Sequence, residues 1–212
     1  MPSYPDRFGA ANLVAMRDGF GTFASPQNAF FSGRVAMILQ GVWIHNFIKN
    51  YAPADFEWGV AAFPGMKPGE QISIINTDLL VIPRGAKHPR EAFEFMAYVN
   101  SQQVMEKLCL GQKKFSPLRR CSPEFFVRHP NPQIRKFLEL ATGPGARPPP
   151  QVPIWNELSA GMKNAVSKIW SGSSDAASAL QDVQTRQQKA LDRRTARWKA
   201  VGPLLEEQWS RQ

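Results

Sequence analysis

The chain has 212 residues, of which 43% are hydrophobic and 11% aromatic, and 26 basic against 17 acidic side chains give a net charge of +9. This length is sufficient for one ordinary domain or two small ones, and the apolar content excludes a disordered chain. No apolar run reaches the roughly 18 residues that a membrane-spanning helix needs. The two cysteines exclude a disulfide-dense scaffold and a four-thiolate zinc site.

Residues 1–27 predict an irregular leader, because Pro2 and Pro5 interrupt a polar stretch. This stretch has neither the basic start nor the apolar core of a signal peptide. Cys109 and Cys121 could form a disulfide in an oxidising compartment, but two reduced thiols, buried or half-buried, are the simpler interpretation. Cysteine usage therefore leaves the compartment open.

Short apolar runs in the first half of the chain predict strands, because each has strand length and is bounded by glycine, proline or polar residues. The predicted strands are 35–39, 58–64, 72–75 and 79–82. A short helix that ends at Gly33 is expected before the first of these strands, and a helix over 42–49 is expected after it.

The second half of the chain predicts helices. Pro89 opens an amphipathic helix at its first turn, where the missing N–H of proline costs nothing, and a second helix over 101–110 ends at Gly111. Further helices are expected from Pro132, over 155–169, and from Ser174 or Asp175 to about Arg194, while 143–153 is too rich in proline for a regular element. The fold class is therefore mixed α/β, with few strands for the number of helices.

Catalytic chemistry finds little support in the sequence. His45, His88 and His129 are scattered, with no carboxylate or thiol at motif spacing, so surface or loop positions are expected for them. Asp55 and Glu57 could form the carboxylate pair of a glycosidase, but the solvated start of a strand is the commoner explanation. We expect no enzyme, no catalytic residue, no metal site and no cofactor.

The densest basic stretch, residues 186–199, could bind phosphate groups. Acidic and amide side chains are interspersed among its basic residues, as on an ordinary solvated helix. A basic nucleic-acid-associated α/β protein is therefore an alternative function and not the preferred one.

Two tryptophans stand beside chain breaks. Trp43 follows Gly41 at a turn, and Trp155 follows Pro153 at the start of a helix. An indole in such a place suits a ligand that is flat and apolar on one face and hydroxylated at its edge, as a sugar is. A place in the hydrophobic core is the competing explanation for each.

Four segments, in the right order, resemble the carbohydrate class of extracytoplasmic solute-binding proteins, which are the receptors of ABC importers and similar to maltose-binding protein. The segments are Phe30–Met37 continuing to Gly41–Trp43 (F-x-x-G-[KR]-x-A-M … G-x-W), Trp58–Pro64, Lys87–Phe95 (K-x-P-E-x-A-x-x-F), and Phe115–Arg119 (G-x-x-P-x-R). The resemblance extends over about 28–194. It implies a type II periplasmic-binding-protein-like fold of two α/β lobes joined by a hinge.

The resemblance also implies a domain organisation, in which this chain is the carboxy-terminal half of such a protein. The implied parts are 28–75 as the first part of the second lobe, 76–118 as the hinge crossing and helices of the first lobe, 119–195 as the helical part of the second lobe, and 196–212 as a tail. An exposed apolar surface is then expected where the first lobe would lie.

The implied ligand site has an apolar and a polar part. Trp43 would stack on the pyranose C–H face, Gly41 would let the ligand approach the backbone, and Trp155 would add a second apolar wall. The polar groups, which would hydrogen-bond sugar hydroxyls, are Asn76, Thr77, Asp78 and Arg119. The family usually carries glycines where 76–78 stand, and Asp78 and Arg119 could equally form an ion pair at the hinge or surface.

The function implied by the resemblance is capture of a mono- or oligosaccharide in an interlobe cleft and its presentation to an ABC permease. The expected partners are a carbohydrate and the permease subunits in the membrane, with no nucleic acid, and the full-length protein is expected to be a monomer. A periplasmic or other extracytoplasmic location follows by resemblance. The present chain is expected to be a truncated form that keeps half of the site and binds weakly or not at all by itself.

Overall fold

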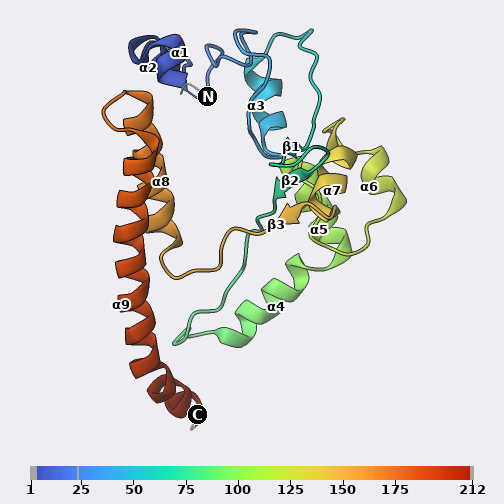
Figure 1. The fold of residues 1–212 in the computed structure, drawn as a ribbon. Coiled ribbons are helices and arrows are strands. Elements are labelled where there is room, and N and C mark those ends of the chain that lie inside the picture. Colours follow the sequence, from blue (N-terminus) through green and yellow to red (C-terminus); the bar gives the residue numbers. More distant parts are fainter. Residues whose placement is uncertain (1–3, 23, 211–212) are drawn as a thin grey trace. The chain divides into compact units, whose positions relative to one another are not determined.

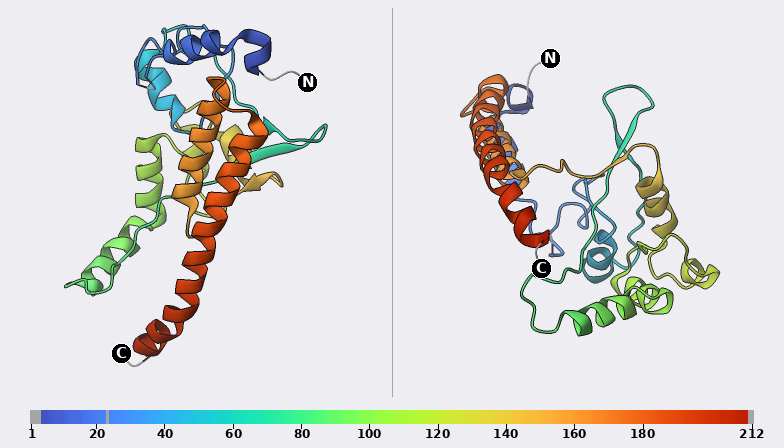
Figure 2. Two further views of the ribbon diagram at one scale, coloured as in Figure 1. Left: turned by 60° about the vertical axis from the view of Figure 1, so that its left-hand side comes forward. Right: turned by 90° about the horizontal axis from the view of Figure 1, so that it is seen from below.

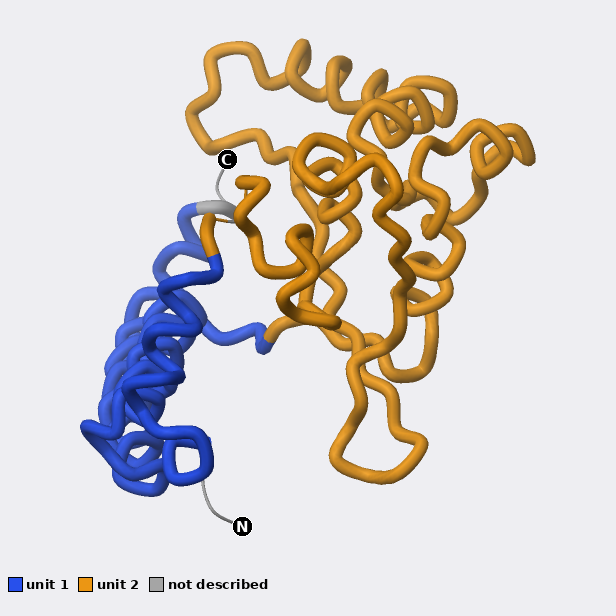
Figure 3. Tube along the Cα trace, turned by 90° about the horizontal axis from the view of Figure 1, so that it is seen from above, with its two compact units in different colours: residues 1–20, 150–212 blue, residues 21–149 orange. Residues whose placement is uncertain are grey.

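The structure, a computed structural model, describes residues 4–22 and 24–210. The chain forms two compact units (Figure 3). Unit 1 consists of Met1–Phe20 and Pro150–Gln212, and unit 2 of Gly21–Pro149. Figure 1 shows the elements in chain order.

Unit 1 is helical. Its helices are α1 (Tyr4–Phe8), α2 (Ala10–Asp18), α8 (Trp155–Trp170) and α9 (Ala176–Ser210). α8 and α9 lie side by side, and α9 extends beyond α8 (Figure 2). Ala165, Ala179 and Val183 are buried between them. The Asp175 carboxylate accepts a hydrogen bond of 2.9 Å from the Ser178 N–H, which confirms Asp175 as the cap of α9.

Two predictions for the ends of the chain are wrong. The expected irregular leader contains α1 and α2, because Pro5 falls in the first turn of a helix, where proline is tolerated. Leu13 is buried, and the Arg17 guanidinium reaches Ser167 Oγ of α8 at 3.4 Å. The expected tail is part of α9, which continues through Pro203 to Ser210.

Unit 2 contains a small sheet. β2 (Gln71–Ile74) pairs antiparallel with β1 (Phe63–Pro64) and parallel with β3 (Ala146–Arg147). The predicted strand at 72–75 is thus confirmed to within one residue. β3 falls in the proline-rich stretch where no regular element was expected, because Gly145 lets the backbones meet: a Cβ there would lie 1.9 Å from the Gln71 carbonyl oxygen.

The other predicted strands are wrong in whole or in large part. Residues 35–39 and 79–82 form no strand, and of 58–64 only Phe63 and Pro64 join the sheet. An apolar run becomes a strand only where a neighbouring strand completes its hydrogen bonds. Met37, Leu79 and Val81 are instead 86%, 76% and 75% exposed.

The helices of unit 2 follow the predictions more closely. They are α3 (Ile44–Tyr51), α4 (Pro89–Val99), α5 (Gln102–Gln112), α6 (Pro123–Val127) and α7 (Ile134–Thr142). The helix expected to end at Gly33 is a series of turns, although Gly33 has the left-handed φ of 71° that is typical of a glycine after a helix. α5 does not end at Gly111 either, since Lys113, with a φ of 57°, takes the left-handed position after the helix.

An apolar surface is exposed on unit 2. α4 has no buried residue, and Phe93, Phe95 and Tyr98 are each 60% exposed or more. The expectation of such a surface agrees with this, whereas the assignment of particular segments to a first or second lobe stays a prediction. No helix within 4–22 and 24–210 is long and apolar enough to cross a membrane.

Candidate functional site

The indole of Trp43 is seated at the start of α3. Gly41 accepts a hydrogen bond from the Ile44 N–H at 3.0 Å, so the chain turns tightly into the helix. A Cβ at Gly41 would lie 2.1 Å from the indole Cζ3, which shows that the ring lies directly against the Gly41 backbone. The indole N–H donates to Gln40 Oε1 at 3.2 Å, and the residue is 45% exposed. The indole of Trp43 is therefore a fixed, half-exposed apolar surface.

A hydrophobic core packs against α3, the helix that begins directly after Trp43. Phe31, Ile44 and Ile48 are buried together, and Phe56 and Trp58 pack against them. Ile44 and Ile48 are four residues apart, so the inner face of α3 is fixed while Trp43 remains at the rim. The core explanation thus applies to these neighbours and not to Trp43.

The end of α5 lies beside α3. The Asn46 side-chain amide donates to the Gln112 carbonyl at 3.1 Å. α5 ends in a Schellman motif: Lys113 N–H bonds Leu110 O at 3.2 Å and Lys114 N–H bonds Cys109 O at 3.0 Å. This motif fixes the positions of both lysines next to the helix that carries Trp43.

Lys114 connects this region to the segment 76–78. Its ammonium lies 3.5 Å from Asp78 Oδ2, and the Asp78 side chain is 96% exposed. Asn76 Oδ1 accepts from the Thr77 N–H at 3.0 Å, and the Thr77 hydroxyl donates to the Asp78 carbonyl at 3.3 Å. All three polar residues are exposed, so they could meet a ligand from solvent, and the Asp78–Lys114 pair contributes at most about 1 kcal/mol to stability.

His45 is buried in α3, two residues after Trp43. Its ring lies 5.9 Å from that of Trp58, and its Nδ1 has no hydrogen-bond partner among the described residues. Burial, and then the nearby charge of Lys113, lower its pKa below the ordinary value of 6.5. The imidazole is therefore held neutral at neutral pH.

The expectation that the histidines occupy surface or loop positions is right for His88 and for His129, which lies in the loop between α6 and α7, and wrong for His45, which is buried in α3. His129 is buried, its Nδ1 accepting from the Asn131 N–H at 3.1 Å and its Nε2 lying 3.1 Å from the Lys114 carbonyl. No spacing in the sequence indicates the burial of these two histidines, because isolated histidines carry no periodic pattern. Lys114 was also missed, although its place after a helix end is a position where cations are favoured.

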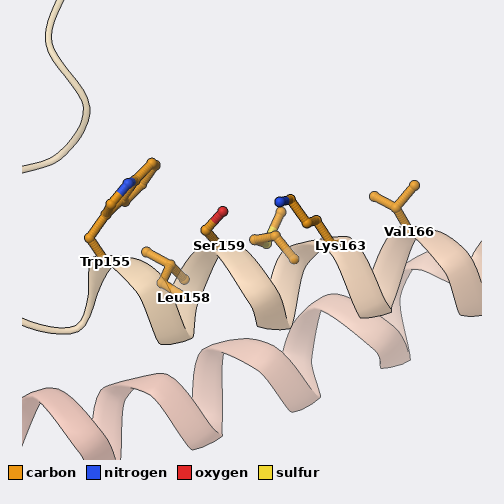
Figure 4. A pocket seen from close by; sticks show the side chains of 6 residues that line it. Trp155, Leu158, Ser159, Lys163 and Val166 are labelled. Atoms are coloured by element: carbon orange, nitrogen blue, oxygen red, sulfur yellow. The ribbon is translucent and has the colours of Figure 1, made fainter. Parts of the chain in front are cut away.

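The remaining predicted site residues are Arg119, in unit 2, and Trp155, in unit 1. Arg119 is exposed in the loop between α5 and α6. Trp155 begins α8 in unit 1 and is 37% exposed. It borders a shallow hollow on the side of α8 that faces away from α9, together with Leu158, Ser159, Met162, Lys163 and Val166 (Figure 4). Direct contact of any of these residues with a ligand stays a prediction.

The described residues contain no cluster of three or more side chains that could hold a metal ion. Asp55 and Glu57 are both exposed, at positions where no strand forms. The candidate site contains a flat apolar ring beside the Gly41 backbone and the Gln40 amide, and unit 2 also exposes the polar residues 76–78. Such a surface can bind a ligand by stacking and hydrogen bonds.

Comparison with known proteins places the chain in a family. The sequence profile of the bacterial extracellular solute-binding proteins matches residues 7–126, more than half of the chain. A protein of Brucella abortus (strain 2308), named only as a binding protein, is 26% identical over 162 residues, which are 76% of this chain and 38% of the relative. The multiple sugar-binding protein of Streptococcus mutans serotype c (strain ATCC 700610 / UA159) is 38% identical over 80 residues, 37% of this chain and 19% of that protein.

A solved structure has a similar fold. CpMnBP1 with mannobiose bound superposes on this chain with a TM-score of 0.72 at 23% identity, covering 86% of this chain and 45% of the other. The expected α/β fold of the periplasmic-binding-protein kind is thereby confirmed. The chain spans less than half the length of the relatives that it matches. On the match over residues 7–126, the chain belongs to the family of bacterial extracellular solute-binding proteins.

Proposed function

We propose that this chain is the sugar-binding part of an ABC import system, capturing a mono- or oligosaccharide and presenting it to the permease. The family to which it belongs consists of extracellular binding proteins, which implies an extracytoplasmic location. One relative is named as a multiple sugar-binding protein, and the superposed structure holds mannobiose. Mannobiose is therefore the first ligand to test.

The observation that carries the proposal is the seating of Trp43. Its ring is fixed against Gly41 and hydrogen-bonded to Gln40, yet 45% of the residue is exposed. A sugar ring presents C–H groups on one face, and an immobilised indole can stack on that face without losing rotamer freedom. The sugar hydroxyls are proposed to bind the exposed residues Asn76, Thr77 and Asp78, of which Asp78 pairs with Lys114.

Trp155 and Arg119 are proposed as further ligand contacts on weaker grounds. Trp155 is partly exposed at the start of α8, beside the hollow shown in Figure 4. Arg119 is exposed on the loop that also carries Lys114. The role involves binding and release without chemistry, so no catalytic residue is proposed.

None of the relatives named above is described as binding nucleic acid. On the basic helix α9, Arg186 pairs with Asp182 at 2.7 Å and Arg194 with Glu157 at 2.6 Å. Part of the positive charge is thus neutralised within unit 1. The nucleic-acid alternative has no support.

Tryptophan fluorescence during titration with mannobiose tests the proposal. Stacking on one indole and a few hydrogen bonds correspond to a Kd of about 1 mM for this chain. Trp43→Ala should abolish the sugar-dependent change, whereas Trp198→Ala, which removes an exposed indole of α9, should leave it intact. An unchanged response in Trp43→Ala would contradict the proposed site.

A further inference from the structure

The two cysteines, at positions 109 and 121, belong to one hydrophobic cluster. Cys109 of α5 is buried with Met105 and Phe125, and Cys121 packs against this cluster from the segment that precedes α6. Cys109 is only 5% exposed, whereas Cys121 is half-buried. The pair therefore consists of one shielded thiol and one thiol that solvent can reach.

Two hydrogen bonds between Ser122 and Glu106, called the clamp below, connect α5 with the segment that carries Cys121. The Glu106 carboxylate accepts from both the Ser122 N–H, at 2.6 Å, and the Ser122 hydroxyl, at 2.7 Å. Glu106 and Cys109 are three residues apart on α5 and so share a face of the helix, while Ser122 directly follows Cys121. The clamp thereby brings Cys121 to the face of α5 that carries Cys109.

We propose that Cys109 and Cys121 are an oxidation site that closes to an intramolecular disulfide with a low-molecular-weight disulfide, such as oxidised glutathione, as the oxidant. The Cys121 thiolate attacks one sulfur of the oxidant, which forms a mixed disulfide and releases one reduced thiol. The Cys109 thiolate then attacks the Cys121 sulfur, and the second reduced thiol leaves. The protein loses two hydrogen atoms and two electrons, and the oxidant takes up both.

The compartment favours this reaction. Membership of the extracellular solute-binding family implies a location outside the cytoplasm, where disulfides persist. Burial raises the pKa of the Cys109 thiol, so its thiolate fraction, and with it the rate of closure by Cys109, increases as pH rises. The site does not depend on which solute the protein binds.

The bond would join the two ends of the loop that carries Lys114 and Arg119. Within this loop, Lys114 pairs with Asp78, and its carbonyl lies 3.1 Å from His129 Nε2. A cross-link between 109 and 121 limits the conformations of this loop in the unfolded chain. Oxidation should therefore raise the Tm by about 5–10 °C.

Mass spectrometry of the intact chain tests the proposal. The fully reduced protein is incubated with oxidised glutathione at mildly alkaline pH and then alkylated with iodoacetamide. We expect a product lighter by two hydrogen atoms that takes up no iodoacetamide, with a peptide map that joins Cys109 to Cys121. Two alkylated cysteines, a stable glutathione adduct at Cys121, or a disulfide between two copies of the chain would each overturn the proposal.

A variant tests the clamp. Glu106→Ala keeps both thiols but removes the carboxylate that holds Ser122, so closure of the mixed disulfide should slow about tenfold. Glu94→Ala is the matched control, because Glu94 is an exposed helix glutamate that pairs only with Arg90 among the described residues. Equal closure rates in the two variants would show that the clamp does not position the cysteines. The wild-type measurement is decisive even if Glu106→Ala does not fold.

Discussion

Gly41→Ala should dislodge the Trp43 indole. A Cβ at position 41 would lie 2.1, 2.3 and 2.6 Å from three carbon atoms of the ring. Since carbon atoms in contact are about 3.5–4.0 Å apart, the indole must shift by about 1.5 Å or more. The shift also breaks the hydrogen bond from the indole N–H to Gln40.

The Gly41→Ala variant should fold correctly but bind mannobiose more weakly. Loss of a well-placed aromatic contact costs about 0.5–1.5 kcal/mol, so the Kd for mannobiose should rise about three- to tenfold. Gly59→Ala is the matched control, because nothing lies within 4 Å of a Cβ at Gly59. Titration followed by fluorescence, with circular dichroism as a check of folding, measures both variants. Equal Kd values for the two variants would refute the inferred seating of Trp43.

Two further predictions concern Lys113 and His45. Lys113→Gly should raise the free energy of unfolding by about 1 kcal/mol, because Lys113 adopts a left-handed conformation that glycine takes without strain. Chemical denaturation measures this change, and an unchanged denaturation midpoint would contradict it. The pKa of His45 is lower in the folded state than its ordinary 6.5, so the unfolded chain binds more protons and stability should fall as pH is lowered through 6.5. His45→Gln should reduce this dependence in denaturation between about pH 5 and 7; identical pH profiles of the wild type and the variant would refute the assignment.

The helices could be predicted from the sequence because their signals are local. Pro89 in the first turn fixes the start of α4, and Asp175 caps α9. Helical hydrogen bonds close within a few residues, so such signals suffice. The start of α1 was missed because Pro5 was interpreted as a break, although proline in a first turn is compatible with a helix.

The strands could not be predicted in the same way. Ile72 and Val81 lie in similar apolar runs, but only the first run pairs with neighbours. Pairing depends on which segments meet in space, and β3 forms only because Gly145 admits the Gln71 carbonyl. An apolar run in the sequence indicates only that a segment could be a strand. Whether a strand forms depends on a neighbouring segment with which it can pair.

The candidate site was predictable in part. The pair Gly41 and Trp43 could be singled out from the turn and the family resemblance, but Gly41 was expected to let the ligand approach the backbone, whereas the Trp43 ring itself lies against it. The ion pair of Asp78 with Lys114 and the burial of His45 depend on contacts between distant segments, so no spacing in the sequence indicates them.

The most direct test of the proposed function is the indole N–H signal of Trp43 in a two-dimensional NMR titration with mannobiose. The signal is assigned from its absence in Trp43→Phe, and the signal of Trp198 serves as the internal control. The account predicts that the Trp43 signal moves in a saturable way, with a midpoint of about 1 mM, while the Trp198 signal stays in place. A Trp43 signal that does not move at saturating mannobiose would contradict the claim that this chain binds sugar through Trp43.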